Sequence, residues 1–441
     1  MLSMGYTYNY PYSSGLKESA SGTNLQLASY TPFAKSNYFF EGEIGNPALL
    51  SQQLGLLHRI VQTHFFKPMP SQLDPVVTSS QEFLRFEGFS TCCGVYVRLD
   101  AKTDAFSIRH LNKGTTNVDF NASMQIALAK LQNSKKSSLQ IGSDEFVLNH
   151  EDESAVEKRV KLPLRWLKGF GEIQNLQSKL EFKFEISTGK SLHWFRRIPK
   201  GRGSAHPVHV GIRNGQLHSS QRSLPGGVKV SGLLRLKVLE PLLASNGKLT
   251  VWADNELGVS AWTIESDLGR FTIVISPDLY RGFSGEGQLL SYLTDSCNIN
   301  QEVRAQLNWS PEVTAESMAE QLNVNPGEIH VALQQLSAEG LLGYDLINET
   351  YFHRELPFDM KSIQQIQPRL KGANKLVDDN AVLRLSNDIG NSIYKISSKD
   401  TEYRVVLSSN GDQCSCPWFS KYLGNRGACK HILAAQIYEK D

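Results

Sequence analysis

The sequence of 441 residues lacks several features that would place it in a familiar class. No apolar run reaches the length of about 18 residues that a membrane-spanning helix needs. The N-terminus has neither the basic stretch nor the apolar core of a secretory signal. Six cysteines are too few for a disulfide framework in a chain of this length. We therefore expect a protein of the reducing cytoplasm.

The chain also lacks an excess of charge of either sign. It has 46 basic and 44 acidic residues, and its formal net charge is +2. This balance predicts no nucleic-acid, membrane or acidic partner for the molecule as a whole. Any electrostatic preference must therefore come from local clusters.

Motifs of common enzyme classes are missing too. The sequence has no P-loop, no G-x-G-x-x-G and no H-E-x-x-H. In "RGFSGEGQ", Ser284 resembles the nucleophile of a hydrolase elbow, but Glu286 occupies a position where that motif needs glycine. Cys92 and Cys93 begin an expected strand, where buried and inert thiols are the simplest interpretation. We expect no enzymatic activity, with an unrecognised hydrolase as the least favoured alternative.

The length exceeds what one core accommodates and predicts an α+β, multidomain protein. Residues 1–35 are polar and rich in Tyr and Ser, and they predict a flexible N-terminal arm. Helix and strand patterns then alternate over residues 36–294, which predicts an α+β domain as the body of the molecule.

Local signals in this body are clear at several points. A stripe of Leu50, Leu54, Leu57 and Val61 has helical spacing. "GVYVRLD" and "AFSIRHL" alternate as strands do, and "GLLRLKVLEPLLAS" predicts a helix. Asn214-Gly215 supplies the two residues with positive φ that a tight hairpin turn needs.

Residues 295–360 change the pattern. "TAESMAEQLNVNPGEIHVALQQLSAEGLLGYDLINETYF" has the form helix, turn, helix, hairpin, which predicts a winged helix-turn-helix module. Between Trp309 and Asp359 there are nine acidic residues and one base, Arg354. DNA affinity comes largely from neutralising phosphates, so this acidic module favours a protein partner over DNA.

Positive charge gathers in residues 186–239, which contain no acidic residue. Within this segment "HWFRRIPKGRG" brings Arg196, Arg197, Lys200 and Arg202 next to two aromatic residues. Phosphate-binding charge beside stacking surface is typical of nucleic-acid contacts. The alternative is a solvated basic face, or a face that docks on an acidic neighbour.

The last part of the chain carries the most specific pattern. Three of the six cysteines and one histidine fall in "CSCPWFSKYLGNRGACKH", as Cys414-x-Cys416, twelve residues, and Cys429-x-His431. Three thiolates and one imidazole make a closed tetrahedral set for one structural Zn²⁺. Two alternating strands precede the pattern and a helix follows it, which predicts a small zinc finger over residues 375–441. A redox CxC pair is the alternative interpretation.

This motif and its flanking elements resemble the SWIM zinc finger. Upstream stretches, "FFEGEIGNPALL", "DPVVTSSQEFLRFEGFSTCCGVYVRLD", "GTTNVDF" and "RGFSGEG", are similar to bacterial SWIM zinc finger family proteins. The resemblance implies a zinc-binding adaptor. Relatives are often encoded beside a MoxR-type AAA ATPase and a von Willebrand A-domain protein. The resemblance therefore suggests these two proteins as partners. SWIM modules are proposed to bind proteins or DNA, so nucleic-acid binding through residues 186–239 and the finger stays the alternative.

Overall fold

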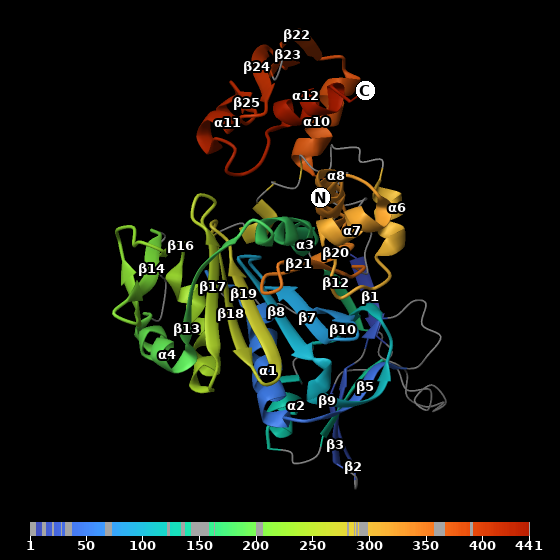
Figure 1. Cartoon of the computed structure of the whole chain (residues 1–441), viewed down its shortest axis with the longest axis vertical. Coiled ribbons are helices and arrows are strands. Elements are labelled where there is room, and N and C mark those ends of the chain that lie inside the picture. Colours follow the sequence, from blue (N-terminus) through green and yellow to red (C-terminus); the bar gives the residue numbers. More distant parts are fainter. Residues whose placement is uncertain are drawn as a thin grey trace.

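The structure of the protein is a computed structural model. It describes residues 6–440 except for gaps at 11–14, 20–21, 28, 31–37, 67–72, 121–123, 134–136, 143–157, 163, 200–205, 280–281, 286, 288–289, 291–298, 357–366 and 389–390. Figure 1 shows a broad body around a large sheet, a group of helices beside it, and a C-terminal unit that projects beyond those helices. The fold is thus a mixed α/β arrangement with several sheets.

The largest sheet forms the centre of the body. Its strands lie in the order β13-β17-β18-β19-β8-β7-β6-β10-β4, and their pairings are antiparallel. The bounds are β4 Ser29–Tyr30, β6 Val76–Ser79, β7 Phe83–Phe89, β8 Val95–Lys102, β10 Gly114–Val118, β13 Glu181–Ser187, β17 Lys248–Asp254, β18 Val259–Ser266 and β19 Gly269–Ile275. Strand β8 lies between β19 and β7, so distant segments hold this sheet together.

A second sheet joins the N-terminal segment to the body, in the order β2-β3-β11-β5-β9. Its strands are β2 Gly15–Ser19, β3 Gly22–Leu27, β5 Tyr38–Ile44, β9 Phe106–Leu111 and β11 Ser137–Gly142, while β1 Tyr6–Tyr10 pairs apart from it with β12 Lys158–Leu162. The flexible arm predicted over residues 1–35 is therefore wrong for the described residues there. Leu25 and Leu27 are fully buried where β3 pairs with β11, a partner that local composition does not reveal.

Helices α1 Pro47–Gln62 and α3 Leu164–Gln177 pack on the central sheet, and α2 Met124–Leu131 packs on α1 and on β2 and β3 of the second sheet. Two short 3₁₀ turns are η1 Thr103–Ala105 and η4 Gly282–Gly285. The predicted stripe of α1 is confirmed, because all four of its side chains are buried, and α1 packs on β7 and β8. The helix predicted over residues 232–245 is instead the 3₁₀ helix η3, Leu233–Ala244. Pro241 lies inside it and has no N–H to donate to an α-helical ladder.

A small lobe adjoins one edge of the central sheet. It contains α4 Thr188–Arg197 and a sheet in the order β15-β14-β16, with β14 Val208–Arg213, β15 Gln216–Ser220 and β16 Val228–Val230. The predicted hairpin is confirmed, since Asn214 and Gly215 have φ of 53° and 71° between β14 and β15. Helix α4 was not predicted, because its basic residues were interpreted only as charge.

The segment after residue 299 contains α6 Asn300–Gln306, α7 Ala315–Leu322, α8 Pro326–Ala338, and a hairpin of β20 Leu342–Asp345 and β21 Thr350–His353. Thr314 caps α7, because its side chain accepts a hydrogen bond from the Ser317 N–H. Helix α8 lies against α3, and the Asn175 side chain donates to the Gln334 carbonyl. From Ala332 to Ala338 every residue of α8 is buried.

Buried charges join this hairpin to the central sheet. Arg354, just after β21, donates to both carboxylate oxygens of Glu87 on β7 at 2.6 Å. Asp345 on β20 pairs with Arg85 at 3.5 Å and with Arg270 at 3.0 Å. Because a buried charge is costly without its partner, these pairs fix the hairpin against the body.

The C-terminal unit has its own sheet and core. Its elements are α10 Pro368–Asp378, β22 Val382–Asp388, β23 Asn391–Ser398, β24 Thr401–Ser408, β25 Gln413–Cys414, α11 Pro417–Tyr422 and α12 Lys430–Tyr438. The sheet runs β22-β23-β24-β25, and α10 packs against α12. The two strands predicted before the cysteines are confirmed as β23 and β24. Within the described ranges, no helix combines the length and apolar character that crossing a membrane requires.

Candidate metal centre

Each of the four predicted ligands lies at the end of an element. Cys414 closes β25, which pairs with Val405 of β24. Cys416 and Cys429 are the N-caps of α11 and α12, and their sulfurs accept hydrogen bonds from the backbone N–H groups of Phe419 and Ile432 at 3.4 Å. His431 follows in the first turn of α12. These short elements thus bring Cys414 and Cys416 together with Cys429 and His431, which follow them after twelve intervening residues.

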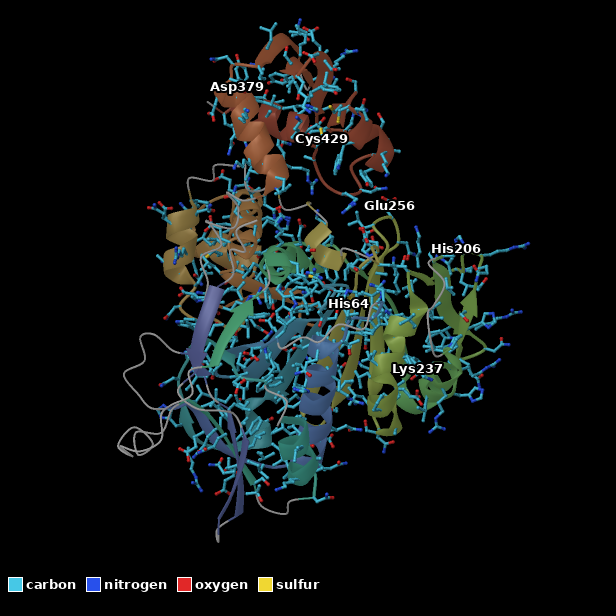
Figure 2. All side chains as sticks on the ribbon, turned by 180° about the vertical axis from the view of Figure 1, so that it is seen from behind. His64, His206, Lys237, Glu256, Asp379 and Cys429 are labelled. Carbon is cyan, nitrogen blue, oxygen red and sulfur yellow. The ribbon has the colours of Figure 1, made fainter. Side chains whose placement is uncertain are left out.

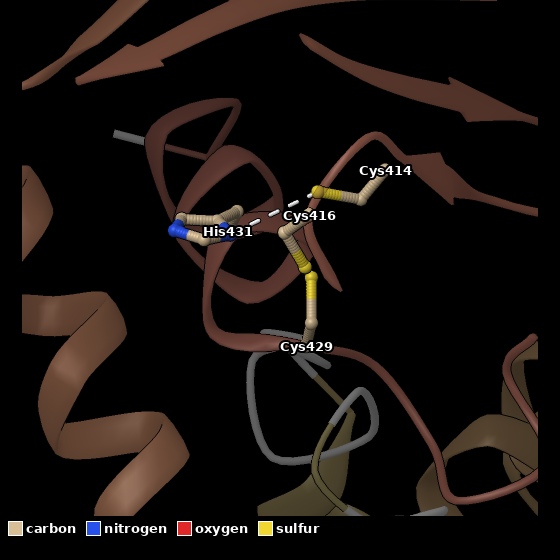
Figure 3. A group of neighbouring side chains, drawn as sticks. All are labelled: Cys414, Cys416, Cys429 and His431. Carbon is tan, nitrogen blue, oxygen red and sulfur yellow. Dashed lines mark hydrogen bonds between the residues drawn. The ribbon is translucent and has the colours of Figure 1, made fainter. Parts of the chain in front are cut away.

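The cluster is compact and buried. The ligand atoms of Cys414, Cys416, Cys429 and His431 all lie within 4.8 Å of one another, and no side chain of the four is exposed. Figure 3 shows the three sulfurs and the imidazole facing a common centre, with 3.8 Å between Cys414 Sγ and His431 Nδ1. The edges of a tetrahedral zinc site are roughly 3.3–3.8 Å long, so the distance from Cys414 to His431 matches such an edge, and the compact donor set suits one structural Zn²⁺.

The electrostatics of the cluster suit a cation. The pKa of Cys429 is lowered to about 4, because its sulfur accepts hydrogen bonds from the Cys414 thiol, His431 and backbone N–H groups. The pKa of Cys414 is raised, chiefly because it donates that hydrogen bond to Cys429, and burial raises the pKa of Cys416. Without metal the sulfurs hold protons among themselves, and a bound Zn²⁺ replaces those protons.

Two residues that support the cluster have no signal in the sequence. The ring of Tyr403 stacks on His431 with 4.3 Å between ring centroids, which orients the imidazole. Arg369 on α10 donates to the carbonyls of Arg426 and Ala428 at 2.7 and 3.0 Å, in the loop that leads to Cys429. Spacing rules find ligands but not these supporting contacts, since Arg369 lies far upstream of the motif.

The other predicted residues are not part of this cluster. Arg196 and Arg197 are exposed at the C-terminal end of α4, while Lys200 and Arg202 lie outside the described residues. Among the residues considered for catalysis, Ser284 is partly buried. Cys92 and Cys93 are buried in the turn before β8 rather than at its start, and burial raises the pKa of the Cys93 thiol. A protonated, buried thiol is a poor nucleophile.

The comparisons with known proteins agree with this geometry at the C-terminus. The SWIM zinc finger family matches residues 403–438. No curated protein matches the chain. One solved structure, the "C-terminal region of FEN-1 bound to A. fulgidus PCNA", is 10% identical with a TM-score of 0.34, over 54% of this chain and 98% of that chain. A similarity of that size carries no argument about fold or function.

The matched residues include β24, the four clustered ligands and α12. Sequence family, ligand set and local fold therefore point to the same module. Residues 403–438 of this chain are a SWIM zinc finger, with Cys414, Cys416, Cys429 and His431 as its zinc-binding cluster.

Proposed function

We propose that the chain is a non-catalytic zinc-binding adaptor that assembles protein partners through its finger and an acidic winged-helix-like module. The observation that carries the proposal is an apolar surface on the C-terminal unit, at the free edge of its sheet. Zinc holds this surface in shape and takes no part in chemistry, since the four ligands leave it no open coordination position.

The apolar surface lies on strand β22. Leu383 and Leu385 are 53% and 55% exposed, and the pairing of β22 with β23 shifts register between Arg384 and Ser386. In the described sheet β22 pairs only with β23, so no described strand pairs with its other edge. An edge strand with exposed leucines is suited to accept a strand from another protein.

The helices and hairpin of residues 300–353 supply the winged-helix-like module. Its helix α8 would be the one that reads DNA, but half of it is buried against the body, as described above. The module has two bases: Arg304 on α6 is exposed, and Arg354, just after the hairpin, is fully buried and held by Glu87. Exposed acidic side chains remain, among them Glu316, Glu320 and Glu328. Such a surface repels phosphates and attracts a basic protein surface.

For the partner we propose a MoxR-type AAA ATPase or a von Willebrand A-domain protein, as the family resemblance implies. The test is co-purification of the full-length chain with each purified candidate, followed by calorimetric titration. The L383S/L385S variant should weaken binding at least tenfold, a loss of about 1.4 kcal/mol or more. Ile126→Ser, which changes another exposed apolar side chain on α2, is the matched control and should bind normally.

Two results would count against the adaptor. If neither candidate binds the wild-type chain, the proposed partners are wrong. If one binds and L383S/L385S binds equally well, the edge of β22 is not the docking surface.

A further inference from the structure

A cavity of about 400 Å³ lies in the small lobe, between helix α4 and strand β15. Figure 1 shows this lobe at the left side of the body, apart from the zinc finger, and Figure 2 shows it from behind with Lys237 labelled. The cavity walls combine positive charge, imidazoles, an indole and an aliphatic side chain: Lys190, His193, Trp194, Arg197, Leu217 and His218. The metal site and the proposed protein surface use none of these residues.

The charge of the cavity is of one sign. None of the described residues that line it is acidic, and the sequence from 186 to 239 contains no Asp or Glu. Lys190 and Arg197 are exposed, and neither forms an ion pair with another described residue. Arg197 lies in the last turn of α4, where a cation interacts favourably with the helix dipole. Lys190 lies in the first turn, where the dipole disfavours a cation, so helix stability does not explain its position. A ligand with negative charge accounts for both.

Hydrogen bonds to backbone carbonyls hold the walls of the cavity in place. Lys237 Nζ donates to the carbonyls of Phe195 and Arg196 at 2.8 Å, which fixes the last turn of α4. At the other end of the helix, Thr188 Oγ1 donates to the Ser245 carbonyl at 2.6 Å. Phe195 is fully buried beneath the helix. The cavity is therefore formed before any ligand arrives, and binding needs little reordering.

An aromatic surface completes the cavity. Trp194 is partly buried and packs edge-on against Phe195, with 5.0 Å between ring centroids. A held indole beside two cations offers a stacking surface next to phosphate-binding groups. The volume is near the lower end of the range of about 300–1,000 Å³ for small-molecule pockets, which suits one nucleotide rather than a large ligand.

We propose that this cavity binds a nucleotide, with Lys190 and Arg197 on the phosphate and Trp194 against the base. This function goes beyond protein assembly and is independent of it. The nucleotide comes either free or as one unit of a single-stranded nucleic acid, and both sources present the same chemistry to the cavity.

The experiment titrates the zinc-loaded, full-length chain with adenosine monophosphate, a short single-stranded oligonucleotide and inorganic phosphate. Binding is followed by calorimetry and by quenching of tryptophan fluorescence. Binding of the monophosphate identifies a free nucleotide as a ligand. Binding of the oligonucleotide alone identifies the nucleic acid, and its affinity should then fall with salt.

Matched variants distinguish binding inside the cavity from non-specific attraction by the positive charge of residues 186–239. K190Q/R197Q should weaken nucleotide binding about tenfold or more, because a charge-assisted contact to the phosphate is lost. R213Q/R222Q removes two exposed cations of the same segment outside the cavity and should change affinity less than about twofold. Trp194→Leu should remove the fluorescence response and weaken binding of nucleotide but not of phosphate.

The proposal is overturned by any of three results. The first is that the wild-type chain binds neither the monophosphate nor the oligonucleotide. The second is that it binds inorganic phosphate as tightly as the nucleotide. The third is that K190Q/R197Q and R213Q/R222Q weaken binding by the same factor.

Discussion

At the scale of single residues, the four zinc ligands are the one group of His, Cys, Asp and Glu side chains in the described part of the chain whose ligand atoms gather as a metal site requires. Four side chains with no charge partner share one small space, and burial of such a set is unfavourable unless a cation fills it. Structural zinc in small modules supplies binding free energy on the order of 10 kcal/mol at neutral pH. The C-terminal unit should therefore depend on its metal.

The first prediction concerns one ligand. Cys429→Ser should abolish stoichiometric zinc and unfold the C-terminal unit, while the body keeps its own thermal transition. Elemental analysis and calorimetry measure the two effects. Cys92→Ser, which changes a buried cysteine outside the cluster, is the control and should retain one zinc per chain. Full zinc content in Cys429→Ser would contradict the assigned ligand set.

A second residue-scale prediction concerns Arg369. Its guanidinium holds two carbonyls of the loop before Cys429 and stacks on Trp418 at 4.8 Å. Arg369→Ala should destabilise the finger by about 1–3 kcal/mol and release zinc faster to a chelator, with the ligands unchanged. Lys371→Ala, an exposed change on the same helix, should leave the release rate as it is. Equal rates for both variants would show that the loop needs no such support.

At the scale of elements, the hairpin β20–β21 is attached to the body through charge. The Arg354–Glu87 pair is fully buried, and the Tyr96 hydroxyl donates a further hydrogen bond to Glu87 at 2.5 Å. Removing one member of such a pair leaves an uncompensated charge, whereas replacing both does not. The attachment can therefore be dissected by single and double substitution.

The third prediction follows from this difference. Arg354→Met should destabilise the chain by about 3–5 kcal/mol, because Glu87 is then buried without its partner. The double variant E87Q/R354M should recover much of that loss. Chemical denaturation of the wild-type chain, Glu87→Gln, Arg354→Met and the double variant measures the coupling. If the double variant is as unstable as the sum of the two single variants, the pair is not coupled and the hairpin is held by its apolar contacts.

Elements differ in how far the sequence could predict them. Helix α1, the β14–β15 hairpin and the strands before the cysteines follow from patterns within a few residues, and these were predicted correctly. Strand β3 was missed because its partner β11 is remote, and η3 was misassigned because Pro241 acts against a pattern that is otherwise helical. The zinc ligands were predictable because ligand spacing is local, whereas Arg369 and Tyr403 reach the site only through tertiary folding.

At the scale of the whole molecule, acid should separate the hairpin from the body. Burial opposes ionisation of Glu87, but Arg354 and Arg98 attract the carboxylate and hold its pKa below the ordinary value of 4.5. Burial likewise opposes ionisation of Asp345, and Arg85, Arg98 and Arg270 hold its pKa below 3.8. A carboxyl whose pKa is depressed by folding stabilises the native state above its ordinary pKa, and that contribution is lost as pH falls.

The fourth prediction is therefore a loss of stability that begins as pH drops below about 4.5 and continues toward the depressed values. Acid also protonates the zinc ligands, so the comparison must isolate the hairpin. E87Q/R354M lacks Glu87, one of the two carboxyls described above, and its stability should fall less steeply than that of the wild-type chain over the same range. Calorimetric scans of the body transition, at several pH values, give both slopes. Parallel slopes would mean that Glu87 titrates alike in the folded and unfolded chains, and that Arg354 does not hold its charge.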